Sequence, residues 1–134
     1  MDRDTFRRLA LLRLAEAKAL LASGHYHGAY YLCGYAVECA LKACLARKTK
    51  RFDYPPEPGV VRQSYYTHQL PELLKQIGGP LASELPLHPG WAEVRKWSPD
   101  CRYQVGTAEG DARLLLSAVA HRREGVLRCI RKYW

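Results

Sequence analysis

The sequence predicts an all-α fold, an antiparallel helical bundle. Apolar residues recur at helical spacing in long segments of the chain, and no alternating pattern of the kind that marks a strand stands out. Clusters of glycine and proline separate these segments. The chain has 134 residues, of which 48% are hydrophobic, and this is enough for one globular core. We therefore expect residues 1–134 to form a single helical domain.

The first expected helix runs from Thr5 to Ala22, with Asp4 or Thr5 as its N-terminal cap. Ser23 and Gly24 end it, because glycine readily adopts the backbone conformation that stops a helix. The connection is so short that the next helix must return antiparallel beside the first. The residues expected to face the core follow helical spacing: Phe6, Ala10, Leu14, Ala17 and Leu21.

The second expected helix runs from Tyr26 to Ala46 and is apolar or aromatic on nearly every side. Its central turns carry two charges, Glu38 and Lys42, which are four residues apart and therefore share one face. Charged groups are costly to bury unless they are paired and hydrogen-bonded. The helix therefore predicts a polar, aromatic stripe inside the bundle or at a subunit seam. At helical spacing the stripe also includes His27, Tyr31 and Tyr35.

The remaining elements are shorter or interrupted. A proline-rich loop is expected from Lys48 to His68, followed by a short helix from Pro71 to Ile77. A second short helix is expected near Trp91 to Trp97. The last helix is expected from Ala108 to Tyr133, with Thr107 as its cap, because its apolar residues keep helical spacing throughout. The expected bundle thus has three long or medium helices and two short ones.

The charge of the chain favours an anionic partner. The formal net charge is +8 at pH 7, which suits RNA, a nucleotide or an acidic protein. No stretch is long and apolar enough to span a membrane, and the N-terminus lacks the order of a secretory signal. We therefore expect a cytoplasmic protein with no membrane partner.

The sequence gives no positive indication of a metal or a cofactor. The five cysteines are odd in number and include no C-x-x-C pair, so we expect small buried apolar side chains and not disulfides or a zinc site. Phosphate-binding loops, dinucleotide-binding glycine motifs and the common hydrolase motifs are absent. We expect neither a metal nor a cofactor.

The second helix also carries a family resemblance. Its pattern A-x-Y-L-x-G-Y-A-x-E-x-x-L-K resembles the second helix of HEPN domains, which are small helical domains found beside minimal nucleotidyltransferases and in RNA-cleaving toxins. Two further segments are similar to the family, Tyr66 to Leu74 and the Arg102-Tyr103 pair. The residues that match the helix pattern are Ala29, Tyr31, Leu32, Gly34, Tyr35, Ala36, Glu38, Leu41 and Lys42.

The resemblance implies a nucleotide- or RNA-binding module. Such a module would form a homodimer and act with a minimal nucleotidyltransferase in a toxin–antitoxin-like pair. Tyrosines can stack on bases or fill the core, and Arg102 can pair with Glu38 or point at a phosphate. The residues expected to bind the ligand are Tyr31, Tyr35, Glu38, Lys42, Arg102 and Tyr103.

Two alternatives stay open. The catalytic members of the family are metal-independent ribonucleases with an Arg-x4-6-His motif, and Arg62 and His68 have that spacing here. Histidine would transfer protons and arginine would stabilise charge on the phosphate. His68 can instead satisfy backbone groups at the start of the third helix, together with Thr67. The other alternative is a purely structural dimeric interaction module, in which the polar stripe is only a subunit seam.

Overall fold

The computed structural model describes residues 1–48 and 67–134. These residues form seven α-helices and two short 3-10 helices and contain no β-strand, so the predicted all-α bundle is confirmed. None of the described helices has the length and apolar character that crossing a membrane requires. The predicted proline-rich loop falls almost entirely outside the described residues.

Helix α1 spans Arg3–Ala22 and begins earlier than predicted. The Asp2 side chain caps it by accepting a hydrogen bond from the Thr5 backbone N–H at 2.7 Å, so the expected cap at Asp4 or Thr5 is wrong. Asp4 lies in the first turn, where negative charge is favourable. All five residues expected to face the core are buried: Phe6, Ala10, Leu14, Ala17 and Leu21.

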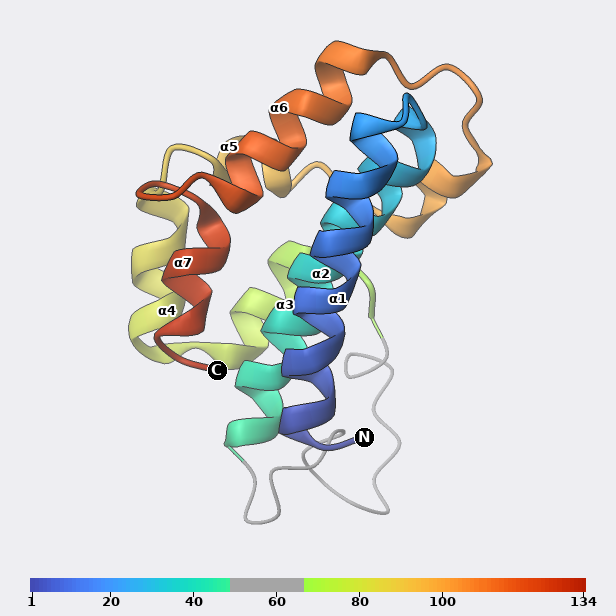
Figure 1. Ribbon diagram of the computed structural model, residues 1–134. Helices are drawn as coiled ribbons and strands as arrows, with labels where there is room; N and C mark the ends of the chain where they lie inside the picture. The colour runs from blue at the N-terminus through green and yellow to red at the C-terminus, as the bar shows by residue number, and fades with distance from the viewer. Residues whose placement is uncertain (49–66) are drawn as a thin grey trace.

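A tight turn joins α1 to α2, which spans Tyr26–Arg47. Gly24 has a φ of 80°, a conformation that glycine adopts without steric cost. The His25 backbone N–H donates to the Leu20 carbonyl at 2.8 Å and so satisfies one of the free carbonyls at the end of α1. As predicted, the two helices lie side by side and antiparallel (Figure 1).

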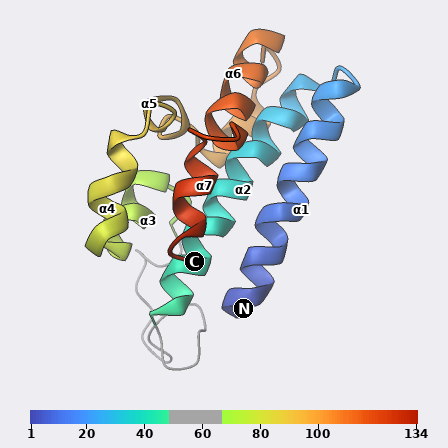
Figure 2. The same ribbon diagram turned by 60° about the vertical axis from the view of Figure 1, so that its left-hand side comes forward.

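Helix α2 is the centre of the bundle. Thirteen of its 22 residues are buried. It packs against α1 and against the later helices, some of which are seen in front of it and beside it in Figure 2. A helix that is apolar on most sides must be covered on most sides. Helices α1, α3, α6 and α7 therefore take their positions largely from their contacts with α2.

The segment between α2 and the C-terminal helices contains more short helices than predicted. Helix α3 spans Leu70–Ile77, and α5 spans Trp91–Val94 in the region where a short helix was expected. The structure adds α4, Gly79–Glu84, and two 3-10 helices, η2 at Leu85–Leu87 and η3 at Pro99–Tyr103. The added elements each have a proline in their first turn, where the missing N–H costs nothing. Prolines that we expected to interrupt helices therefore also lie at the start of short helices.

The predicted single C-terminal helix is wrong, because the chain breaks it in two. Helix α6 spans Glu109–Ala120, capped by Ala108 and not by Thr107, and α7 spans Val126–Arg131. The His121 ring accepts hydrogen bonds from two backbone N–H groups of the turn between them.

Glycine makes this turn possible. A Cβ on buried Gly125 would lie 2.6 Å from the carbonyl oxygens of Val119 and His121. The tight turn lets α7 fold back along α2 and α4 and does not continue the line of α6 (Figure 1). The apolar spacing continues across the turn, which is why periodicity alone predicts one helix.

A second close approach fixes η3 and the segment before it against α2. A Cβ on Gly34 would lie 2.2 Å from the indole ring of Trp97, which is 1% exposed. Glycine in a helix interior is otherwise unfavourable. Gly34, one of the residues of the family pattern, is therefore explained by the packing of Trp97 on α2.

We expect Gly34→Ala to lower the free energy of unfolding by about 1–3 kcal/mol, because the added methyl group overlaps the Trp97 ring and forces a repacking. Denaturant melts measure this. The matched control is Gly110→Ala in α6, where a Cβ would meet nothing within 4 Å. Alanine is the better helix former, so the control should leave stability unchanged or raise it by less than about 1 kcal/mol. Equal effects of the two variants would contradict this account of Gly34.

Candidate functional site

The predicted polar stripe of α2 contains a buried ionic cluster. Glu38 is 1% exposed, although it is an acid in the central helix. Its Oε1 accepts a hydrogen bond from Lys42 Nζ at 2.9 Å, and the Lys42 side chain is only 12% exposed. The same oxygen lies 2.7 Å from Nδ1 of His68, just before α3. The expected Glu38–Lys42 pair is therefore formed, and His68 joins it.

Histidine 68 has a different neighbour from the one expected. The Thr67 hydroxyl satisfies the Gln69 backbone N–H at 3.1 Å at the start of α3, as anticipated for this pair of residues. The His68 ring instead reaches back to Glu38, and its side chain stays 56% exposed. An ionised carboxylate only accepts hydrogen bonds, so Nδ1 is the donor and Nε2 is left for other partners. Arg62, the other candidate catalytic residue, lies outside the described residues.

One oxygen of the cluster is left over. Glu38 Oε2 is buried and has no hydrogen-bond partner among the described residues. An unmade hydrogen bond on a buried charged group is costly. Lys42 and His68, the two partners of Oε1, therefore stabilise a carboxylate that the rest of α2 does not solvate. Removing either partner should lower the free energy of unfolding.

The aromatic part of the stripe is stacked. The rings of Tyr31 and Tyr35 are nearly parallel, with centroids 6.1 Å apart, and Tyr31 also faces Trp97 at 6.2 Å. Both tyrosines are half-buried. Burial raises the pKa of the Tyr35 hydroxyl, and the Arg13 guanidinium of α1 lies 5.9 Å from the Tyr35 ring centre. The stripe therefore presents partly exposed rings with a cation at one side.

Arg102 and Tyr103 lie at the end of η3 and are both exposed. The Arg102 guanidinium lies 5.0 Å from the centre of the Tyr103 ring. Hydrogen bonding to Tyr103, and then to Tyr31, raises the pKa of Arg102. The alternative that Arg102 pairs with Glu38 is wrong, because the described partners of Glu38 are Lys42 and His68. The structure thus brings Arg102 and Tyr103 to the Tyr31 end of the stripe.

One turn before Tyr31, in the first turn of α2, His27 is also engaged. Its Nε2 accepts a hydrogen bond from the Thr107 backbone N–H at 3.1 Å. This contact ties the segment before α6 to the first turn of α2. His27 therefore has a structural partner, and we do not count it among the ligand candidates.

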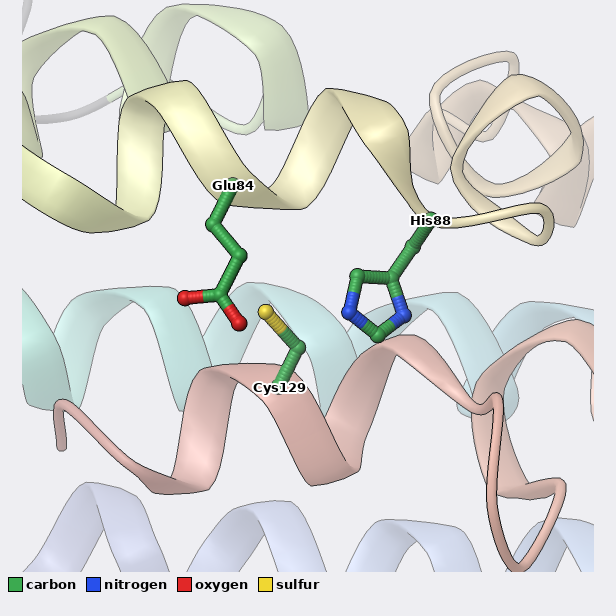
Figure 3. Close-up of side chains that lie close together, drawn as sticks. All are labelled: Glu84, His88 and Cys129. Atoms are coloured by element: carbon green, nitrogen blue, oxygen red, sulfur yellow. The ribbon is translucent and has the colours of Figure 1, made fainter.

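Sequence reasoning missed one cluster of metal-ligand residue types. Glu84, His88 and Cys129 have ligand atoms within 4.8 Å of one another, and Figure 3 shows the Cys129 sulfur between the carboxylate and the imidazole. Glu84 and His88 are four residues apart, but Cys129 comes from α7, so no local motif marks them. Their residue types would suit zinc.

The contacts of this cluster favour a structural role. Lys132 and Tyr133 both hydrogen-bond the Glu84 carboxylate, and these bonds lower its pKa. Burial, and then the charge of Glu84, raise the pKa of the Cys129 thiol to about 11. A metal would have to displace an ammonium group and a tightly held thiol proton. We therefore interpret the cluster as the tie that fastens α7 to α4.

The burial of the Glu38–Lys42 pair gives a stability prediction. Lys42→Ala leaves the carboxylate of Glu38 with His68 as its one partner among the described residues, so we expect a loss of roughly 3 kcal/mol in the free energy of unfolding, measured in denaturant melts. The double variant Glu38→Gln/Lys42→Ala should lose less than the sum of the two single changes. Lys96→Ala, which breaks the exposed pair with Glu93, is the control and should cost less than about 1 kcal/mol. Additive, small effects at Glu38 and Lys42 would show that the pair is not buried in solution.

The comparisons with known proteins agree with this structure. The HEPN domain family matches residues 4–80, which is more than half of the chain. The match includes all but the first residue of α1, the whole of α2 with Glu38 and Lys42, and α3. A search of curated proteins and a search of solved structures each gave no match. The chain therefore belongs to the HEPN domain family.

Proposed function

We propose that this protein is a nucleotide- or RNA-binding module. Membership of the HEPN family supports a nucleotide- or RNA-related role. The observation that carries the proposal is the position of Arg102 and Tyr103 beside Tyr31. One arginine, one exposed ring and one half-buried ring thus share a surface. Single-stranded nucleic acids are bound by this combination, because bases stack on rings and phosphates pair with arginine.

Each residue of the surface has a distinct part in the proposal. Tyr103 is 74% exposed and offers its ring to a base. Arg102 is next to it and offers a planar guanidinium to a phosphate. Tyr31 and Tyr35 are stacked and half-buried, so they form a rigid wall. On the same helix, the contact of Glu38 with His68 ties α2 to the segment just before α3.

The proposal extends to the partners of the protein. HEPN domains commonly dimerise, and we propose that this chain forms a homodimer. We propose further that it acts in the cytoplasm with a minimal nucleotidyltransferase in a toxin–antitoxin-like pair. The net charge of +8 favours an anionic ligand or an acidic partner. A minimal nucleotidyltransferase encoded beside this chain and co-purifying with it would support the pairing.

The binding surface predicts a specific loss. Arg102→Ala and Tyr103→Ala should each weaken binding of a labelled single-stranded RNA by about five- to a hundredfold, because one base stack or one charge-assisted phosphate contact is worth about 1–3 kcal/mol. Fluorescence anisotropy measures the change. Arg95→Ala, an exposed arginine elsewhere, is the matched control and should have little effect.

Three outcomes distinguish the hypotheses. Loss of binding at Arg102 and Tyr103, with the control unchanged, supports the proposed surface. Unchanged binding in both variants would move the site elsewhere. An intact dimer that binds neither RNA nor nucleotide would favour the purely structural interaction module.

The contact between His68 and Glu38 favours a second candidate function, metal-independent RNA cleavage. A buried carboxylate that holds Nδ1 of an exposed histidine orients the ring and leaves Nε2 to accept a proton. In this reaction Nε2 takes the proton of a ribose 2′-hydroxyl, and the 2′-oxygen attacks the neighbouring phosphorus. The bond to the 5′-oxygen breaks and leaves a cyclic phosphate and, after protonation, a 5′-hydroxyl. Arg62 would stabilise the charge on the phosphate.

The cleavage hypothesis gives its own prediction. Wild-type protein should cleave RNA in the presence of EDTA, with a pH profile set in part by a histidine. His68→Ala should abolish cleavage, and Glu38→Gln should reduce it and change the pH profile, because the amide cannot hold the imidazole as a carboxylate does. The dimer and the helical circular dichroism spectrum of His68→Ala should stay as in the wild type. Cleavage that survives His68→Ala, or that needs a metal, would rule out this mechanism.

A further inference from the structure

A groove lies between α1 and the two C-terminal helices, α6 and α7. It is separate from the proposed binding surface of Tyr31, Tyr35, Arg102 and Tyr103, which we call the Tyr31 surface. Its volume is about 570 Å³, within the usual range for ligand sites. Among the described residues that line it, five are basic or titratable and none carries a carboxylate. These five are Lys18 of α1, His121 and Arg122 of the turn, and Arg128 and Arg131 of α7.

Several basic side chains of the described surface pair with acids, as Arg13 does with Glu16 and Arg113 with Glu109. Lys18 and Arg122 have no carboxylate partner within the described part of the chain. Unpaired like charges that share a groove repel one another, and a bound anion removes this cost.

Two of the arginines are held in place. Arg128 donates to the Arg122 backbone carbonyl at 2.9 Å, which fixes the turn at the end of the groove. Arg131 stacks over the Trp134 ring at 5.4 Å. An arginine that is fixed by a ring or a backbone contact loses less conformational entropy when it binds a phosphate.

The groove continues along α1. A second hollow, which shares Leu11 and Arg131 with the first, is lined by Arg7 and Arg8 and ends against Trp134. One acid lies there, Asp4, which pairs with Arg7 in the first turn of α1. Basic side chains thus follow a line from the turn after α6 to the N-terminal end of α1. A line of this kind fits a chain of phosphates better than a single anion.

The floor between these cations is apolar. Leu11 is 43% exposed in the groove, and Leu14 and Leu127 lie beneath it. A groove that combines an apolar floor with a cationic rim can take both the sugars and bases and the phosphates of one chain.

We propose that this basic groove binds the phosphate backbone of single-stranded RNA. The identity of the polyanion as RNA rests on the proposed function, but the groove is a separate surface. Arg13 faces Tyr35 on one flank of α1, whereas Leu11 and Lys18 face α6 and α7 on the other. The groove would then bind nucleotides that flank those bound at the Tyr31 surface, or a second segment of the same RNA.

The test compares two triple variants with equal loss of charge. The groove variant is Lys18→Gln/Arg122→Gln/Arg131→Gln, and the control is Lys75→Gln/Arg95→Gln/Lys96→Gln on other exposed positions. Both are titrated with labelled single-stranded RNA at several salt concentrations, after a thermal melt has shown that they are folded. The groove variant should bind at least about tenfold more weakly, and its slope of log affinity against log salt should fall by about 2, since each single-strand phosphate contact contributes about 0.7. The control should keep the wild-type slope.

The outcomes separate this inference from the proposed function. An unchanged slope in the groove variant overturns the groove as an RNA site, and Arg102→Ala still tests the other surface independently. Equal losses in the groove and control variants mean that net charge alone matters, which also overturns it. Competition by polyglutamate as strong as that by RNA would assign the groove to an acidic protein and overturn the inference. If wild-type protein binds no RNA, both proposals fail.

If the groove variant does not fold, the paired substitution Lys18→Gln/Arg122→Gln replaces it, because neither side chain stacks on a ring of residues 1–48 or 67–134. The expected fall in slope is then about 1.4 by the same arithmetic. If the slope of the paired variant equals that of the wild type, the inference is overturned, as it is for the triple variant.

Discussion

A single carboxylate in the central helix constrains the rest of the bundle. Glu38 is buried among apolar side chains, and a buried charge without partners would be strongly destabilising. Lys42 supplies one partner from the next turn of the same helix, and His68 supplies the other from the start of the α3 segment. Since the His68 contact joins segments 30 residues apart, it fixes where the chain must return to α2. The buried leucines of α3 pack against α2 as well, so the ionic and the apolar contacts agree on this placement.

The other constraint on α2 is steric and acts at Gly34, four residues before the carboxylate. Gly34 leaves room for the Trp97 ring directly against the helix backbone, and Tyr31 stacks on the same ring. The family pattern therefore combines two separate physical requirements on one face of α2, a space for an indole and a place for a paired acid. The residues Arg102 and Tyr103 follow Trp97 closely in the chain, so the packing of Trp97 also positions the proposed ligand surface.

Much of the fold follows from the sequence, because the signals are local. The core positions of α1, the turn at Gly24 and the burial of the α2 charges all follow from helical spacing and from the cost of burying a charge. The break between α6 and α7 does not, because the apolar register continues across it and only the backbone packing at Gly125 requires it. The site shows the same division. The pair of Glu38 with Lys42 is local and could be predicted from helical spacing. The contacts of His68 with Glu38 and of Glu84 with Cys129 join distant segments, so no local pattern predicts them.

The turn at Gly125 has a consequence for how the protein would respond to a ligand. A continuous helix would carry the arginines of α7 away from α1, so the groove exists only while α7 is folded back. Anything that binds across Lys18 and Arg131 therefore contacts the first and the last helix at once. Such a ligand would stabilise the docked C-terminus over any opened form, by a free energy that rises with the logarithm of its concentration once the groove is mostly occupied. Closure of the two ends of the chain and occupancy of the groove would then be thermodynamically linked, so that each favours the other.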